Sequence, residues 1–165
     1  MAKKFTITLG RECGAGATLI AQTLSRDLNI PYYDKDIFRM VSDRSGVLEE
    51  FFHVNNERPG NHLLYKIIKD LNPKDQKPSL GKDIVSPDNL FRFQSELIRE
   101  LADNETCMII GRCSDYILRD RDHVVKVFVC GDPESKVRRM MSTFSLERSA
   151  AIDRIRDTDK QRRKY

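Results

Sequence analysis

The chain has 165 residues, of which 39% are hydrophobic and 33% are charged, and it carries a net charge of +4 at pH 7. This length allows one domain with a hydrophobic core rather than two, and the residue balance is that of a soluble globular protein. No apolar run is long enough to span a membrane and no secretory signal precedes the first predicted strand, so the sequence predicts a cytoplasmic protein.

The first part of the chain alternates between strand and helix patterns. Residues 5–9 alternate apolar and polar side chains, as a strand does, and a glycine-rich turn follows them. A stripe of leucine and isoleucine predicts a helix over 18–28, and a second short strand is expected at 30–34. Three further helices and then a charged loop are predicted at 34–43, 47–53, 62–71 and 72–83.

The second part continues this alternation. Ser86 and Pro87 begin a helix that runs to about residue 102, because serine caps a helix and proline suits its first position. Apolar strands are predicted at 106–110 and 124–129, then a helix opened by Asp132-Pro133 and a charged helical segment from residue 145. Strands separated by helices rather than hairpins predict an α/β fold with a parallel sheet.

The turn after the first strand resembles a phosphate-binding loop. In the pattern G-x-x-x-x-G-K-S/T, Gly16 and Thr18 fit, whereas Arg11 replaces the first glycine and Ala17 replaces the lysine. The same turn is compatible with a dinucleotide-binding site, in which Asp34 would contact the ribose, and with a structural turn that binds nothing. The loop by itself leaves these three interpretations open.

Positive charge recurs later in the chain. Arg112 directly follows the strand at 106–110, at the edge where open α/β sheets bind ligands, and its guanidinium can bind a phosphate through two hydrogen bonds. The segment 138–164 is rich in lysine and arginine, which indicates a phosphorylated ligand, nucleic acid or a solvated helix face. No aromatic stacking platform accompanies these residues, so we expect no nucleic-acid partner.

Four stretches together resemble the cytidylate kinase-like family of P-loop nucleoside monophosphate kinases. They read "ITLGRECGAGATLIAQTLSRDLNIPYYDKDIF", "DNLFRFQSELIRELAD", "IIGRCSDYILRDRDHVVKVFVCGDPESKVRR" and, at the end, "IRDTDKQRRKY". The first is similar to a divergent branch whose loop reads Arg-Glu-x-Gly-Ser-Gly-Gly and lacks the lysine. The resemblance covers nearly the whole chain.

This resemblance implies one domain over 1–165 with a three-layer P-loop NTPase-type α/β fold, in which helices flank a parallel sheet. It also implies a helical acceptor-binding region at about 35–105 and an arginine-rich lid at about 142–165. The family pattern continues to a further C-terminal strand near the donor base, and we expect these 165 residues to lack it.

The resemblance further implies roles for individual residues. Arg11 is the candidate replacement for the missing lysine. Asp34 would begin the acceptor region, and Arg112 would bind the acceptor. The residues expected around the donor phosphates of ATP are Gly14, Ala15, Gly16, Ala17 and Thr18, with the Thr18 hydroxyl on Mg²⁺. The arginines expected to act in catalysis are Arg112, Arg138, Arg156 and Arg163.

We therefore expect an ATP- and Mg²⁺-dependent kinase that transfers the γ-phosphoryl group to CMP, dCMP or a related small acceptor. The alternative is a nucleotide-binding regulatory protein of the same fold with little or no kinase activity. Ala17 favours that alternative, as does Cys113, which stands where cytidylate kinases carry aspartate. The expected partners are nucleotide substrates, without nucleic acid or membrane, and the sequence leaves the oligomeric state open.

Overall fold

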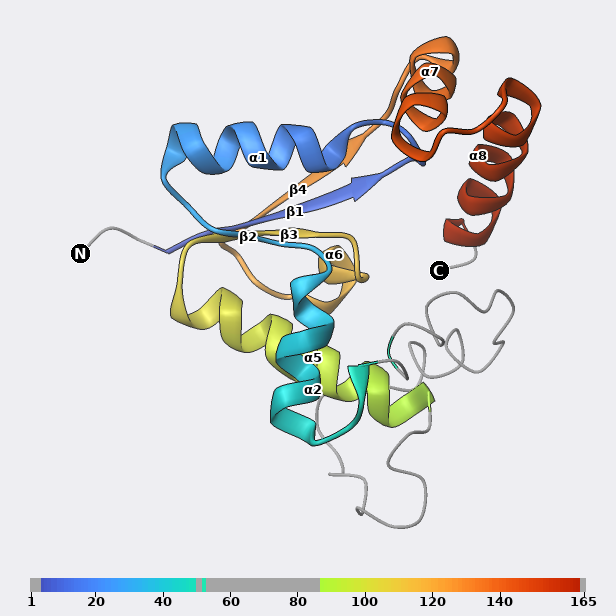
Figure 1. Ribbon diagram of the computed structural model, residues 1–165. Helices are drawn as coiled ribbons and strands as arrows, with labels where there is room; N and C mark the ends of the chain where they lie inside the picture. Colours follow the sequence, from blue (N-terminus) through green and yellow to red (C-terminus); the bar gives the residue numbers. More distant parts are fainter. Residues whose placement is uncertain (1–3, 50–51, 53–86, 164–165) are drawn as a thin grey trace. The chain divides into compact units, whose positions relative to one another are not determined.

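The computed structural model describes residues 4–49, 52 and 87–163 (Figure 1). The helix predicted at 62–71, the loop at 72–83 and the Ser86 cap lie outside the described residues, and the helix predicted at 47–53 lies partly outside them. The chain divides into two compact units. The first contains the residues up to Asp34 and those from Ile98 to Arg163, and the second contains Lys35–Leu97.

The first unit is built on a parallel sheet, which confirms the predicted α/β fold. Its four strands are ordered β2-β3-β1-β4, so β1 lies between β3 and β4 (Figure 1). In this register Leu9 is paired with Ile110 on one side and with Val127 on the other. The carboxyl ends of β1, β3 and β4 therefore meet at one edge. The strand bounds are β1 Thr6–Arg11, β2 Tyr32–Tyr33, β3 Cys107–Ile110 and β4 Val124–Val129.

The two apolar strands predicted in the second part of the chain differ in burial. Every residue of β3 is buried, as its sequence indicated. In β4, by contrast, Val125, Val127 and Phe128 are exposed. The reason is its place in the sheet, because β4 is the last strand of the described order and has β1 on one side only. An apolar pattern identifies a strand but does not say whether it is central.

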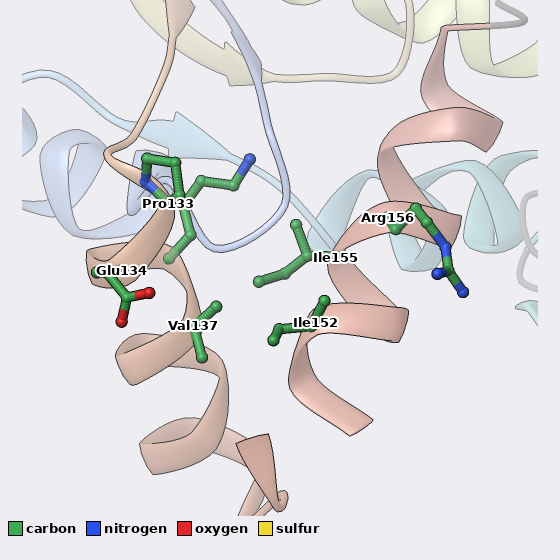
Figure 2. A pocket seen from close by; sticks show the side chains of 7 residues that line it. Pro133, Glu134, Val137, Ile152, Ile155 and Arg156 are labelled. Carbon is green, nitrogen blue, oxygen red and sulfur yellow. The ribbon is translucent and has the colours of Figure 1, made fainter. Parts of the chain in front are cut away.

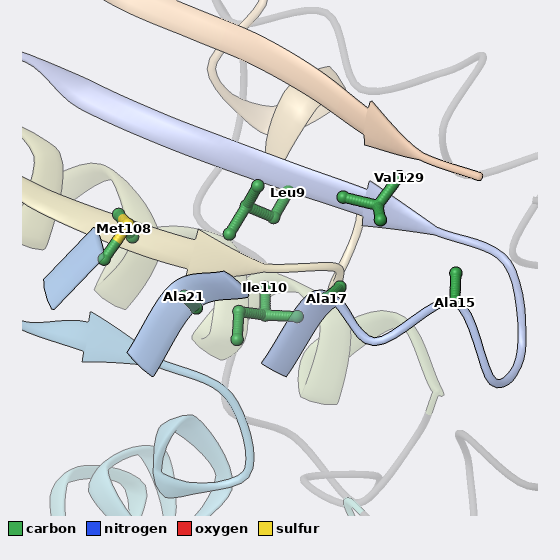
Figure 3. Packing of buried hydrophobic residues seen from close by; sticks show 7 residues of the cluster. All are labelled: Leu9, Ala15, Ala17, Ala21, Met108, Ile110 and Val129. Atoms are coloured by element: carbon green, nitrogen blue, oxygen red, sulfur yellow. The ribbon is translucent and has the colours of Figure 1, made fainter. Parts of the chain in front are cut away.

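The core of the first unit lies between the sheet and α1 (Ala17–Leu28), which contacts β1 and β3. Figure 3 shows its small and aliphatic side chains, contributed by three strands, the loop and the helix. Alanines on α1 allow the helix to approach the strands closely. The buried members are Leu9, Ala15, Ala17, Ala21, Met108, Ile110 and Val129.

Three more helices follow β3 in the first unit. The shortest is α6 (Ser114–Ile117), and the two others, α7 (Pro133–Phe144) and α8 (Arg148–Arg162), pack against each other. The predicted start of α7 is confirmed, since the Asp132 carboxylate accepts a hydrogen bond from the Ser135 N–H at 2.9 Å and Pro133 takes the first position.

The second unit contains α2 (Asp36–Ser45) and the beginning of α5 (Pro87–Asn104). Helix α2 buries Ile37, Phe38 and Val41, and the Phe38 ring stacks on Phe52 with centroids 6.1 Å apart. None of the helices in the described ranges has the length and apolarity needed to cross a membrane.

Candidate functional site

The glycine-rich loop between β1 and α1 is shaped by two glycines with left-handed backbone. Gly14 has φ +75° and Gly16 has φ +88°, and residues other than glycine rarely adopt such values. A Cβ at Gly14 would lie 3.0 Å from the Lys136 carbonyl oxygen, and one at Gly16 would lie 3.1 Å from the Arg139 Cζ. Within the described chain no side chain caps α1, so its first amides remain available to an anion.

Ala17, at the position where phosphate loops usually carry lysine, contributes no charge. Its methyl group is buried in the core beneath the loop, beside Ala21 and Ile110 (Figure 3). Any cation that serves this loop must therefore come from another element.

Arg11 ends β1, and its guanidinium lies over the turn that follows β3. That turn is made by Gly111 (φ +68°), where an added Cβ would overlap the Arg11 Nη1 atom. The Arg11 Nη2 lies 3.6 Å from the Asp34 Oδ1. The absence of a side chain at Gly111 therefore lets Arg11 reach the acid that follows β2.

Two further arginines lie close to Arg11. Arg112 follows Gly111 in a left-handed conformation (φ +59°), and Arg162 of α8 donates from Nη1 to the Arg11 carbonyl at 3.2 Å. Burial lowers the pKa of Arg112 to about 10, with repulsion from Arg11 and Arg162 adding to this and Asp34 opposing it. Burial and Arg162 likewise lower the pKa of Arg11. Arg11 and Arg112 thus lie near Asp34 and Arg162 lies beside Arg11, and this surplus of positive charge favours binding of an anion.

Thr18 and Asp34 bring two hard oxygen ligands together beside this arginine cluster. The Thr18 hydroxyl donates to the Asp34 Oδ2 at 3.4 Å, and the Thr18 side chain is exposed. In the described part of the chain no three acidic, histidine or cysteine side chains form a metal cage. One hydroxyl and one carboxylate fit Mg²⁺, which in phosphoryl-transfer sites takes its remaining ligands from water and substrate phosphates.

Helices α7 and α8 approach the other side of the loop through a charged network. The Lys136 Nζ lies 3.1 Å from the Glu12 Oε2 and 3.0 Å from the Asp159 Oδ2. The Asp159 Oδ1 accepts a hydrogen bond from the Cys13 N–H at 2.6 Å, and the Glu12 Oε2 accepts one from the Gly131 N–H at 3.2 Å. Lys136 is 8% exposed, whereas the Glu12 side chain is 27% exposed, so the ammonium is better shielded from water than its Glu12 partner.

The charges of this network hold one another in their ionised forms. A hydrogen bond from Lys136 and one from Gly131 lower the pKa of Glu12. Burial by itself would lower the pKa of Lys136, but hydrogen bonds to Asp159 and Glu12 outweigh it and the pKa is raised. Lys136 and Asp159 were not among the residues predicted from the sequence.

The predicted basic residues of α7 and α8 lie in different surroundings. Arg138 is exposed and donates to the Ser135 hydroxyl at 3.2 Å, whereas its neighbour Arg139 donates from Nη1 to the Gly14 carbonyl oxygen. Arg156 pairs within its own helix, and the charge of Arg163 lowers the pKa of Glu12.

A helical spacing offers a signal for Lys136, together with Arg139 of the same helix, but not for Asp159 of α8. Lys136 and Arg139 are three residues apart, which places both on one face of α7. The adjacent Val137 and Met140 are buried, so this face of α7 is directed inward.

Replacing Glu12 with glutamine tests this network through pH. The folded pKa of Glu12 is below its ordinary value of 4.5, so ionised Glu12 stabilises the fold above that pH and loses this effect as pH falls through the lowered pKa. We expect Glu12→Gln to be less stable than the parent protein near neutral pH and the difference to shrink below pH 4.5. Urea unfolding at a series of pH values measures this, and a difference independent of pH would contradict it.

Comparison with solved structures shows the same fold in other proteins. An uncharacterized protein from Eubacterium ventriosum ATCC 27560 is 24% identical, with a TM-score of 0.64 over 96% of this chain and 73% of that one. A shikimate kinase from Bacteroides thetaiotaomicron is 17% identical, with a TM-score of 0.52 over 98% of this chain and 80% of that one. These likenesses show a kinase-like α/β fold.

No curated protein sequence matches the chain. A family model does match it, from residue 6 to residue 165, which includes the loop, the arginine cluster and the charged network. The matched family is described as the cytidylate kinase-like family. The resemblance recognised in the sequence is thereby confirmed, and the chain belongs to the cytidylate kinase-like family.

Proposed function

We propose that this protein is a P-loop kinase that uses ATP and Mg²⁺ to phosphorylate CMP, dCMP or a related small acceptor. The observation that carries the proposal is the cluster of Arg11, Arg112 and Arg162, in which Arg11 and Arg112 lie near Asp34, beside a loop that ends at a helix N-terminus. Phosphoryl transfer requires little covalent chemistry from a protein. It requires the two substrates in line and positive charge around the transferred group.

The donor phosphates are assigned to the loop, whose amides and helix N-terminus attract anions. Gly14 and Gly16 permit the backbone conformation, and Arg139 brings a guanidinium to the same loop from α7. Thr18 and Asp34 would hold the Mg²⁺, which when bound neutralises charge on the donor phosphate oxygens.

The phosphate of the acceptor is assigned to Arg112 and Arg11, because a guanidinium binds a phosphate through two parallel hydrogen bonds. The neighbouring Cys113 does not replace the aspartate of cytidylate kinases. Burial raises the pKa of its thiol to about 11, so the side chain is neutral at pH 7. A neutral thiol cannot accept hydrogen bonds as a carboxylate does, and the proposal therefore includes acceptors related to CMP.

The second candidate function is nucleotide binding for regulation, with little or no catalysis. The observation that favours it is the buried Ala17, which leaves the loop without the usual lysine. In either case we propose nucleotides as the partners and the cytoplasm as the location, where ATP is abundant.

A ligand titration followed by thermal unfolding tests the proposal. A ligand that binds the folded protein raises its melting temperature, so ATP, ADP, CMP, dCMP, UMP and AMP are each added with and without Mg²⁺. We expect a magnesium-dependent shift with ATP, a shift with one monophosphate, and turnover when the two are combined. Shifts with ATP alone and no turnover would favour the regulatory function. No shift with any ligand would contradict both functions.

Two variants test the assigned metal ligands. Thr18→Val and Asp34→Asn each remove one hard oxygen from the pair, so the magnesium concentration needed for half of the ATP-dependent shift is expected to rise about tenfold. Any shift that ATP produces without Mg²⁺ should be the same in both variants as in the parent protein. An unchanged magnesium requirement in both variants would show that the metal is held elsewhere.

A further inference from the structure

The Asp159 carboxylate lies between a loop amide and a buried ammonium group. Its Oδ1 accepts from the Cys13 N–H at 2.6 Å and its Oδ2 lies 3.0 Å from the Lys136 Nζ. A backbone amide of a glycine-rich loop and a lysine ammonium are the two kinds of donor that bind phosphate oxygens in P-loop proteins. A carboxylate side chain of α8 thus satisfies donors of the kind that serve an anionic ligand.

The carboxylate of Asp159 opposes a second anion at this point. Glu12 and Asp159 share the ammonium of Lys136 through contacts of 3.1 and 3.0 Å, and the charge of Arg163 also acts on Glu12. A phosphate that approached the Cys13 amide would meet the carboxylate of Asp159 at close range. Because like charges repel at close range, the phosphate and this carboxylate compete for the same donors.

We propose that Asp159 occupies the place of a donor-phosphate oxygen, and that binding of the donor displaces it from Lys136 and Cys13. Lys136 of α7 then contacts the donor phosphates in place of the lysine that this loop lacks. The inference rests on the proposed binding of ATP at the loop, and it adds a cation and a competing anion to that site.

The packing of α7 and α8 supports a carboxylate that can leave. Within α8, all of whose residues are described, only Ala151 is buried. A pocket of about 320 Å³ lies between the two helices, lined by apolar side chains that include Val137, Ile152 and Ile155 (Figure 2). An interface that is incompletely filled loses less dispersion energy when one helix shifts.

Lys136 keeps a partner when Asp159 leaves. Its Nζ also contacts the Glu12 Oε2 at 3.1 Å, and Glu12 is held in place by the Gly131 amide. Displacement therefore exchanges one anionic partner of the ammonium for another and does not strand a buried charge.

Calorimetric titration with ATP, and separately with inorganic tripolyphosphate, tests the inference without a turnover assay. Asp159→Asn keeps the shape and an acceptor for the Cys13 amide but removes the competing charge, so affinity is expected to rise about tenfold. Lys136→Met removes the cation and is expected to lower affinity about tenfold, whereas Lys136→Arg should retain most of it. Asp157→Asn and Lys160→Met, exposed changes of the same kind on α8, should leave affinity unchanged.

Competition predicts that ATP affinity rises in Asp159→Asn and falls in Lys136→Met, and these opposite changes distinguish it from a structural role. If the network only holds α8 in place, Asp159→Asn and Lys136→Met will both lower the melting temperature and both weaken or spare ATP binding. An unchanged or weaker affinity in Asp159→Asn, with ATP bound by the parent protein, overturns this inference and leaves the proposed function standing. ATP binding by none of the proteins overturns both. If Asp159→Asn does not fold, equal affinities of Lys136→Met and the parent protein still overturn it.

Discussion

Arg112→Ala is expected to lower kcat/KM for the monophosphate acceptor by about 100- to 1,000-fold, the cost typical of removing one charged donor from a preorganised site. Arg112 is placed at the carboxyl end of β3 by a left-handed turn, and it lies within reach of the charges of Arg11, Asp34 and Arg162. Its pKa is lowered chiefly by burial, with Asp34 opposing the shift and repulsion from Arg11 and Arg162 adding to it. An anionic phosphate relieves that repulsion, so its binding energy depends on this side chain.

Steady-state kinetics and calorimetry with the acceptor measure the effect. The loss should fall on acceptor binding and turnover, and ATP affinity should change little, because the donor phosphates are assigned to the loop. Arg26→Ala is the matched control, since Arg26 is an exposed arginine of α1 whose ion pair is with its neighbour Asp27. Acceptor affinity that is the same in Arg112→Ala and Arg26→Ala would remove Arg112 from the site.

Gly111→Ala is expected to lower kcat/KM about 100-fold and to cost about 1–2 kcal/mol of folding free energy, the penalty for a left-handed alanine. The new Cβ would overlap the Arg11 Nη1, and the guanidinium is the flexible partner that must move. Arg11 then loses its position 3.6 Å from Asp34, so a methyl group outside any direct ligand contact disturbs the arginine cluster.

Gly46→Ala separates the two effects of this substitution. Gly46 has φ +69°, close to the +68° of Gly111, but a Cβ there meets nothing within 4 Å. Both variants should lose similar stability in urea unfolding, and only Gly111→Ala should lose activity. Equal activities would mean that the position of Arg11 does not matter for catalysis, and the arginine cluster would have to be reassigned.

The fold could be predicted from the sequence where local patterns decide the structure. The alternation of 5–9 became β1, and the aspartate–proline pair at 132 and 133 became the start of α7, because strand alternation and helix capping depend on near neighbours. The exposure of β4 could not be predicted in this way. It depends on which strands stand beside it, and that is a property of the whole sheet.

The contacts within the candidate site were even harder to predict from local sequence patterns. Which of the adjacent Arg138 and Arg139 contacts the loop depends on the rotation of α7, and that rotation is fixed by burial of Val137 and Met140. The contact between Glu12 and Lys136 spans 124 residues of sequence. No spacing rule relates two residues so far apart, so the network became visible only in three dimensions.

The register of the sheet also bears on how this chain reaches its folded state. Thr6 in β1 is paired with Cys107 on one side and Val124 on the other, so in the described sheet the first strand has no neighbour until β3 is available and gains its second only with β4. Long-range parallel pairing of this kind carries a large loop-closure entropy and is intrinsically slow to form. During synthesis, β1 must therefore wait for strand partners that leave the ribosome late, although α1 follows it directly and can pack against it. The loop and arginines at its carboxyl end become a site only in that last stage.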